Sequence, residues 1–139
     1  MKKTIAFFVC LVMLFTALPI AVTAAEDELM PLSNNTSTCN ATFNITAQGY
    51  ATFTAKYCGY SGITTNGTIT IQMQKKFLAL FWRDVDDMYW EYSSNNVNYE
   101  VANTIQLSNT GTYRIIVNFT VYGTGGSADT FEKILEAKW

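Results

Sequence analysis

The chain has 139 residues, of which 14% are charged and 14% aromatic, and it carries a formal net charge of −2 with no histidine. Without an imidazole, the sequence excludes a Ser-His-Asp or Cys-His nucleophile, a His-ligated zinc ion and a His-ligated haem. Threonine occurs 19 times. A low share of charge together with many threonine and aromatic residues favours β-strands, and the length is typical of one domain.

The first 24 residues have the pattern of a secretory signal peptide. Lys2 and Lys3 precede an apolar run at residues 5–18, and small residues follow up to Ala24. The run is shorter than the ~20 apolar residues that a membrane-spanning helix needs. We therefore expect residues 1–24 to be removed and the protein to be secreted and extracellular, with an uncleaved membrane anchor as the alternative.

The chain beyond residue 24 is acidic. Seven basic residues remain against 11 acidic residues, which makes its net charge −4. Such a chain offers nucleic acid or anionic lipid no polybasic surface. We therefore expect neither nucleic acid nor, after cleavage, a membrane as a partner.

Two cysteines, Cys39 and Cys58, remain after the signal segment. An even number of cysteines in an oxidising compartment predicts a disulfide. Closing a loop of this length would stabilise the fold by about 3 kcal/mol, because it restricts the unfolded chain. Two free thiols are the alternative.

Residues 25–37 show no periodic pattern of apolar residues, and we expect them to be a flexible lead-in to a domain at residues 38–139. Two alternating strands follow, with the apolar positions Cys39, Ala41, Phe43, Ile45 and Ala47, then Ala51, Phe53, Ala55 and Tyr57. Matching their apolar faces pairs Phe43 with Phe53, which leaves Cys58 one residue out of phase with Cys39. A bulge near Cys58, or a bridge from the first strand to the following loop, would reconcile the pairing with a disulfide.

The middle of the chain predicts two further strands. The first has Ile69, Ile71 and Met73 on one face and ends at Lys75 and Lys76. Residues 77–82 are continuously apolar, so they either cross between sheets or begin a strand buried on both sides. Residues 84–87 predict a turn, after which apolar and polar residues alternate again to residue 92.

The last third predicts three strands. Residues 97–107 alternate with an irregularity at residues 102–103, and a closing strand carries Phe131, Leu135 and Ala137 on one face. Between them, Gly111 and Tyr113 precede a strand in the manner of a tyrosine corner, in which the Tyr hydroxyl bonds back to the preceding loop. About seven strands at this spacing predict an all-β, immunoglobulin-like antiparallel β-sandwich.

Five short motifs carry a resemblance, namely Gly62-Ile63-Thr64-Thr65, Gln74-Lys75-Lys76, the pair Trp82 and Trp90, Gly111-Thr112-Tyr113-Arg114, and Gly125-Gly126. On these motifs the chain resembles small secreted immunoglobulin-like proteins of Gram-positive, clostridial-type bacteria, which belong to families of unknown function. The resemblance covers most of residues 39–139. The resemblance implies an immunoglobulin-like fold and secretion, and it assigns no catalytic residue to this chain.

Two groups of residues are candidates for a site. Four aromatic residues are candidates for a binding face, namely Trp82, Tyr89, Trp90 and Tyr92. Alternation requires either Tyr89 or the pair Trp90 and Tyr92 to face outward, and packing in the core is the competing explanation. The carboxylates of Asp84, Asp86 and Asp87 are a weak candidate for Ca²⁺, with a solvated turn as the competing interpretation.

The sequence therefore predicts a secreted, non-catalytic binding or structural module without a cofactor. Its expected partner is an extracellular protein or a surface polymer. A carbohydrate-binding module that uses exposed Trp or Tyr side chains is the alternative. We expect no enzyme activity, because no motif of a deep catalytic site is present.

Overall fold

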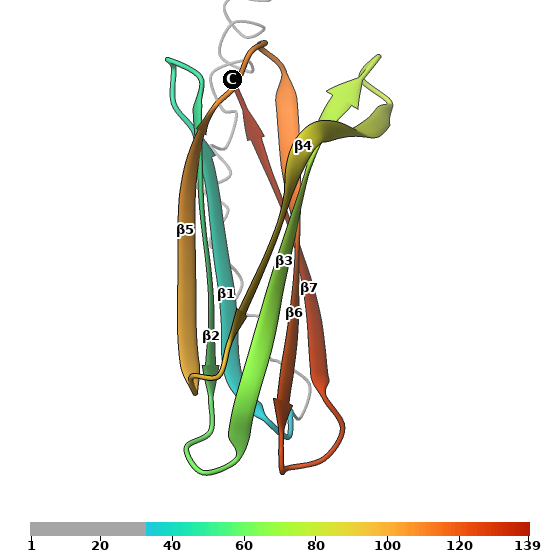
Figure 1. The fold of residues 1–139 in the computed structure, drawn as a ribbon. Helices are drawn as coiled ribbons and strands as arrows, with labels where there is room; N and C mark the ends of the chain where they lie inside the picture. Colours follow the sequence, from blue (N-terminus) through green and yellow to red (C-terminus); the bar gives the residue numbers. More distant parts are fainter. Residues whose placement is uncertain (1–32) are drawn as a thin grey trace, which may run out of the picture.

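A computed structural model describes residues 33–139, which form seven antiparallel strands in two sheets and contain no helix (Figure 1). The strands are β1 (Thr36–Ile45), β2 (Tyr50–Gly59), β3 (Thr64–Phe77), β4 (Phe81–Ser94), β5 (Asn98–Gln106), β6 (Thr112–Gly123) and β7 (Asp129–Lys138). The expected signal peptide lies outside the described residues. Within them, no helix is long and apolar enough to cross a membrane.

The strand order gives one three-stranded sheet, β1-β2-β5, and one four-stranded sheet, β4-β3-β6-β7. In a constant-type immunoglobulin domain the fourth strand joins the first, second and fifth strands. Here β4 pairs with β3 instead, so these two strands form one long hairpin. Pairing of β3 with β6 ends at Lys75 and Tyr113, whereas pairing of β3 with β4 continues to Phe77 and Phe81. The end of the hairpin therefore extends past its neighbouring strand, as Figure 1 shows.

The core lies between the inner faces of the two sheets. Alternation puts every second residue of β2, β3 and β6 inward, and the side chains with no exposed surface include Phe53, Tyr57, Ile69, Ile71, Met73, Ile115, Val117, Phe119 and Val121. The predicted pairing of Phe43 with Phe53 is confirmed. Burial of these side chains is the main favourable term in the free energy of folding.

The predicted disulfide is wrong, because Cys39 and Cys58 are both free. The register pairs Cys39 with Tyr57 and Cys58 with Thr38. Successive residues of a strand point to opposite faces of the sheet, so the Cys39 thiol faces the core while Cys58 faces outward. The register shift between Thr36 and Thr38 lies beyond both pairs and does not bring the two thiols together.

Three local expectations also differ from the structure: the end of the lead-in, the irregularity in β5 and the turn at residues 84–87. The lead-in was expected to end at residue 37, but β1 begins at Thr36, and Asn35 beside it is fully buried. The pairing of β5 with β2 runs without a register shift from Asn98 to Gln106, so the irregularity expected at residues 102–103 is absent.

The turn expected at residues 84–87 is an irregular stretch inside β4. Pairing with β3 jumps there from Tyr89 to Asp84, while β3 advances only from Gln72 to Gln74. Asp87 takes a φ of 60° within this stretch. The extra residues bulge out of the strand, as expected where two strands of unequal length stay paired on both sides.

Candidate functional site

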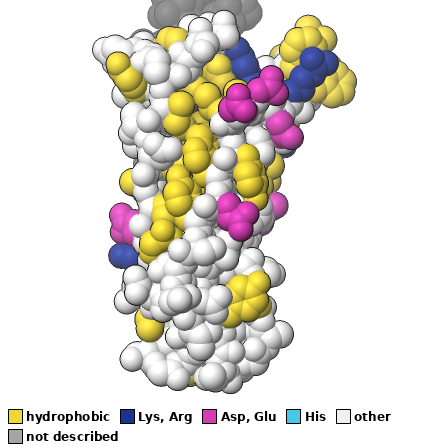
Figure 2. Space-filling view, viewed as in Figure 1, with side chains coloured by type: hydrophobic (Ala, Val, Ile, Leu, Met, Phe, Trp, Pro, Cys, Tyr) yellow, Lys and Arg dark blue, Asp and Glu magenta, His cyan; other side chains and the backbone are white. Residues whose placement is uncertain are grey.

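The end of the β3–β4 hairpin exposes more apolar surface than any other described part of the chain. We call residues 77–81 the hairpin tip. Its exposed fractions are 41% for Phe77, 71% for Leu78, 76% for Leu80 and 61% for Phe81. Among the described residues, the only other exposed large apolar side chain that is not a tyrosine is Ile134. In Figure 2 the tip projects at the upper right as a knob of hydrophobic side chains beside Lys and Arg.

The tip is built by a tight reversal of the chain at three successive residues. The N–H of Leu80 donates to the carbonyl of Phe77 at 3.2 Å, and Leu78 and Ala79 take positive φ values of 49° and 58°. Two positive φ values in succession are typical of the type I′ turns that match the twist of a β-hairpin, which Asn and Gly normally occupy. Leu and Ala there are under backbone strain.

Both expectations for residues 77–82 are therefore wrong, since the run neither crosses between the sheets nor forms a strand buried on both sides. The turn carries none of the residues that usually mark a reversal, and for this reason the sequence pattern missed it. A second signal was present, because basic residues lie directly before and after the run at Lys75, Lys76 and Arg83. Charges at both ends of a short apolar run are typical of a segment that returns to solvent on both sides.

Cross-strand pairs change in polarity step by step behind the tip. Phe77 pairs with Phe81, and the next three pairs are Lys76 with Trp82, Lys75 with Arg83 and Gln74 with Asp84. The order from the end of the hairpin is thus apolar, then amphipathic, then basic, then polar and acidic. We call Lys75, Lys76 and Arg83 the cationic belt.

The belt is held in place by aromatic rings. The guanidinium of Arg83 lies 4.0 Å from the centroid of the Phe77 ring, and Lys76 Nζ lies 5.3 Å from that of Trp82. Arg114 of β6 covers the Trp82 ring at 4.4 Å. Cation–π contacts at such distances each contribute about 0.5 to 1 kcal/mol at exposed sites, so they fix the cations next to the apolar end of the hairpin.

A short polar network ties the hairpin to β6. Arg114 Nε donates to Gln74 Oε1 at 2.7 Å, and Gln74 Nε2 donates to Asp84 Oδ1 at 2.7 Å. A hollow of about 310 Å³ lies at the base of the tip, lined by Lys75, Lys76, Phe77, Arg83, Asp84, Val85 and Asp86. Five of the seven lining residues carry a charge, and the hollow is open to solvent.

The four aromatic candidates do not form one face. Trp90 and Tyr92 pack against the core, and the Trp90 ring lies 5.1 Å from that of Phe53. Tyr89 is 55% exposed on the outer face of the sheet. Trp82 is half-buried beneath cations at the base of the tip. Alternation of side chains along β4 separates the inward pair from Tyr89, as the pattern required.

The acidic candidates do not form a metal site. Asp84, Asp86 and Asp87 are all exposed, and the described residues hold no group of three Asp, Glu, Cys or His side chains that could bind a metal ion. Asp84 instead accepts the hydrogen bond from Gln74. The weak Ca²⁺ candidate is therefore wrong, because the irregular stretch of β4 spreads the three carboxylates rather than converging them.

Tyr113 has the hydrogen bond that defines a tyrosine corner. Its hydroxyl donates to the carbonyl of Asn109 at 2.5 Å, and its side chain is 3% exposed. Gly111 lies between the two residues with a φ of 153°. The bond fixes the connection from β5 to β6, which is a structural role.

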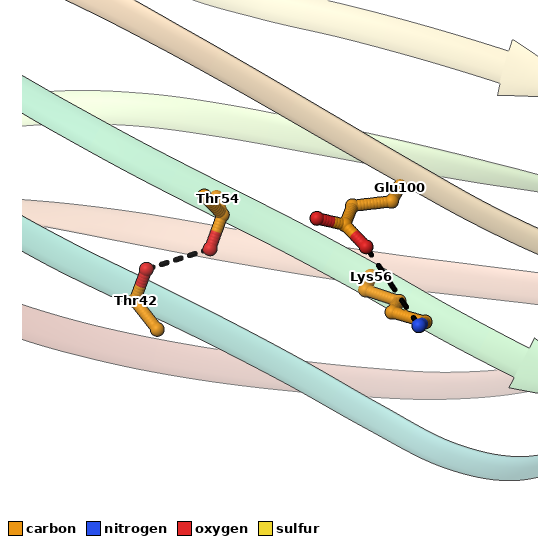
Figure 3. A network of polar contacts seen from close by, with 4 residues as sticks. All are labelled: Thr42, Thr54, Lys56 and Glu100. Atoms are coloured by element: carbon orange, nitrogen blue, oxygen red, sulfur yellow. Dashed lines mark hydrogen bonds and ion pairs between the residues drawn. The ribbon is translucent and has the colours of Figure 1, made fainter.

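The outer face of the β1-β2-β5 sheet is polar. The hydroxyls of Thr42 and Thr54 lie 2.6 Å apart, and Lys56 Nζ lies 3.7 Å from Glu100 Oε2 (Figure 3). Exposed ion pairs of this kind contribute little to stability. This face is thus covered mainly by short cross-strand polar pairs, with Tyr50 as an exposed aromatic side chain at the start of β2.

Comparisons with known proteins show little. No family model matches the chain, and no curated protein matches it. One solved structure is similar, a beta-glucosidase from Listeria innocua in complex with glucose, at 12% identity and a TM-score of 0.40. The match covers 74% of this chain and only 16% of that protein, and it carries no argument about function.

Proposed function

We propose that the chain is a secreted, non-catalytic binding module and that the hairpin tip is its contact surface. The observation that carries the proposal is the exposure of four large apolar side chains, Phe77, Leu78, Leu80 and Phe81, at one end of the fold. Fully burying such a side chain is worth about 1.5 to 3 kcal/mol. A partner that covers the tip therefore gains most of its binding free energy there.

The energetic cost of the tip supports the same proposal. Leu78 and Ala79 take strained backbone conformations, and the exposed apolar side chains add nothing to the core. Strain in a turn that holds exposed apolar groups is a common feature of binding segments, because it is kept by the surrounding structure rather than by local preference. The paired strands behind the tip supply that support.

A carbohydrate-binding module is the second candidate, since Tyr89 is 55% exposed. A sugar ring stacks on a free aromatic face, but the Trp82 ring already carries Arg114 at 4.4 Å. Stacking on Trp82 would have to displace that guanidinium. Tryptophan and tyrosine fluorescence titrated with cell-wall and plant polysaccharides tests this candidate, and a saturable change that Tyr89→Ala abolishes would favour it over the hairpin tip.

The experiment for the proposed function is co-sedimentation of the protein with bacterial cell envelopes. The test variant is Leu78→Ser/Leu80→Ser, and the matched control is Ile134→Ser, which removes an exposed apolar side chain from β7. We expect the test variant to lose at least about tenfold in affinity, while the control binds like the original protein. Equal binding by the tip variant, with an unchanged circular dichroism spectrum, would refute the proposal.

A further inference from the structure

We propose that the partner of the hairpin tip is a lipid bilayer with anionic headgroups, which the tip enters with its apolar end first. This inference rests on the proposed function, because it names the partner of the same surface. It also revises the sequence-based expectation that no membrane is contacted after signal cleavage. That expectation rested on the net charge of the whole chain, whereas the inference rests on where the charges lie.

The order of polarity along the hairpin matches the order of layers in a bilayer surface. Leu78 and Leu80 lie at the end, the Phe77–Phe81 pair follows, and the Lys76–Trp82 pair comes next. In membrane proteins Trp lies at the level of the headgroups, and Lys reaches the same level with its charge outward. The hairpin thus presents apolar, interfacial and charged side chains in the sequence that a bilayer requires.

The length of the apolar end also fits a shallow insertion. The Lys76–Trp82 pair lies one strand step, roughly 3 Å, behind the Phe77–Phe81 pair, and the turn with the exposed Leu78 and Leu80 side chains extends beyond that pair. Interfacial segments bury their apolar groups about 5 to 10 Å into the headgroup and acyl boundary. The exposed apolar side chains of the tip can therefore enter this boundary while the cationic belt stays among the headgroups.

Basic residues gather at this end of the molecule although the chain as a whole is acidic. Beyond residue 24 the chain has seven basic residues, and four of them are the belt residues and Arg114, which covers Trp82. Asp84, Asp86 and Asp87 follow the belt along β4, farther from the tip, and Asp84 accepts a hydrogen bond from Gln74. A surface that approaches the tip therefore meets the three belt cations before the carboxylates, whereas Arg114 lies level with Asp84 on either side of Gln74.

The same charges favour a lipid surface over the two other possible occupants, a pocket on another protein and a second copy of this chain. A pocket on another protein would accept the apolar side chains, but it gives no reason for three cations directly behind them. Contact between the tips of two copies would bring the two cationic belts together, and like charges repel. Anionic headgroups complement the belt, at about fivefold in affinity for each cation near the surface.

The first experiment measures co-sedimentation of the full chain with vesicles. One set contains phosphatidylcholine alone, and the other also contains phosphatidylglycerol. We expect binding to the anionic vesicles to be at least about tenfold tighter, and to weaken as salt screens the belt. Leu78→Ser/Leu80→Ser should lose binding to both sets. Lys75→Gln/Lys76→Gln/Arg83→Gln should lose the preference for anionic vesicles, whereas the control Lys56→Gln, on the outer face of the other sheet, should keep it.

The second experiment locates the tip by fluorescence quenching with lipids brominated on their acyl chains. Trp82 lies behind the tip, whereas Trp90 packs against the core and the Trp139 indole donates to the carbonyl of Ala47. We expect the brominated lipids to quench the emission of the bound protein and Trp82→Phe to abolish most of that quenching. Trp139 lies at the same end as the tip, so quenching that survives in Trp82→Phe/Trp139→Phe would overturn the proposed orientation.

The outcomes separate the lipid proposal from the proposed function. Absence of vesicle binding, together with tip-dependent binding to cell envelopes, would overturn the lipid proposal and leave the binding module intact with a protein or polymer partner. Equal envelope binding by the tip variant would refute both. Concentration-dependent self-association that Leu78→Ser/Leu80→Ser abolishes, without vesicle binding, would identify a second copy as the occupant and overturn the lipid proposal.

Discussion

Single buried polar groups in this fold act by fixing the connections between strands. Tyr113 is 3% exposed and its hydroxyl donates to Asn109, while the hydroxyl of fully buried Tyr57 donates to the carbonyl of Asn96 at 3.0 Å. Each ring fills the core and each hydroxyl satisfies a carbonyl in a loop. The same side chain thus contributes apolar burial and a hydrogen bond that determines the course of the loop.

Substitution of Tyr113 tests this role. Tyr113→Phe keeps the ring but removes the donor to Asn109, so we expect a loss of about 1 kcal/mol in the free energy of unfolding. Urea denaturation followed by tryptophan fluorescence measures it. Tyr122→Phe is the control, because Tyr122 is 44% exposed on the outer face of the same strand. Equal stability of the two variants would show that the bond to Asn109 contributes nothing.

The two cysteines should differ in reactivity. Burial raises the pKa of the Cys39 thiol to about 12, and the nearby charge of Lys133 opposes this shift only in part. Because the thiolate is the nucleophile, iodoacetamide at about pH 8 should modify Cys58 quickly and Cys39 only after unfolding in urea. Peptide mapping by mass spectrometry distinguishes the two sites. If neither Cys39 nor Cys58 reacts, even in urea without reductant, the two residues form a disulfide after all.

At the scale of the element, the β3–β4 hairpin combines a regular ladder with an irregular turn. The ladder follows from alternation and was predictable as far as Lys75. The turn was not predictable, because a continuous apolar run has the same pattern in a buried strand and in an exposed reversal. Only the pairing of Phe77 with Phe81 shows that the chain turns at Leu78 and Ala79.

Relief of backbone strain should stabilise the hairpin. Ala79 has a φ of 58°, which costs an L-residue free energy that glycine does not lose. We expect Ala79→Gly to raise the free energy of unfolding by about 0.5 to 1 kcal/mol without removing a large apolar side chain from the tip. The same substitution at exposed Ala102, inside β5, should lower stability by a similar amount. A loss of stability in Ala79→Gly would show that the turn is not strained.

At the scale of the whole molecule, one polar cluster joins the two sheets where β1 begins. Asp129 of β7 accepts from the N–H groups of Asn34 and Asn35 at 3.1 and 2.7 Å. The Asn35 side chain donates to the carbonyl of Ser127 and accepts from the N–H of Gly125. The first residues of the described chain are therefore fixed to the β6–β7 connection, across the interface between the sheets.

Asp129→Ala should destabilise the whole sandwich. The substitution leaves the N–H group of fully buried Asn35 without its acceptor and also removes the acceptor of exposed Asn34, so we expect a loss of about 1 to 3 kcal/mol. Glu132→Ala, on the exposed side of the same strand, is the control. Thermal unfolding measures the difference, and hydrogen exchange should show earlier opening of β1. If Asp129→Ala lowers the unfolding temperature no more than Glu132→Ala does, the cluster does not join the sheets.

The sequence by itself determined the all-β class, the position and buried face of most strands, and the register of Phe43 with Phe53, because alternation of apolar residues is a local property with a period of two. It left the course of β4 and its buried face open. Only the tertiary structure decided three matters. It placed β4 beside β3, it separated Cys39 from Cys58 on opposite faces, and it turned residues 77–81 out of the sandwich. These depend on which strands become neighbours and where their pairing stops, and a pattern along one strand does not contain that information.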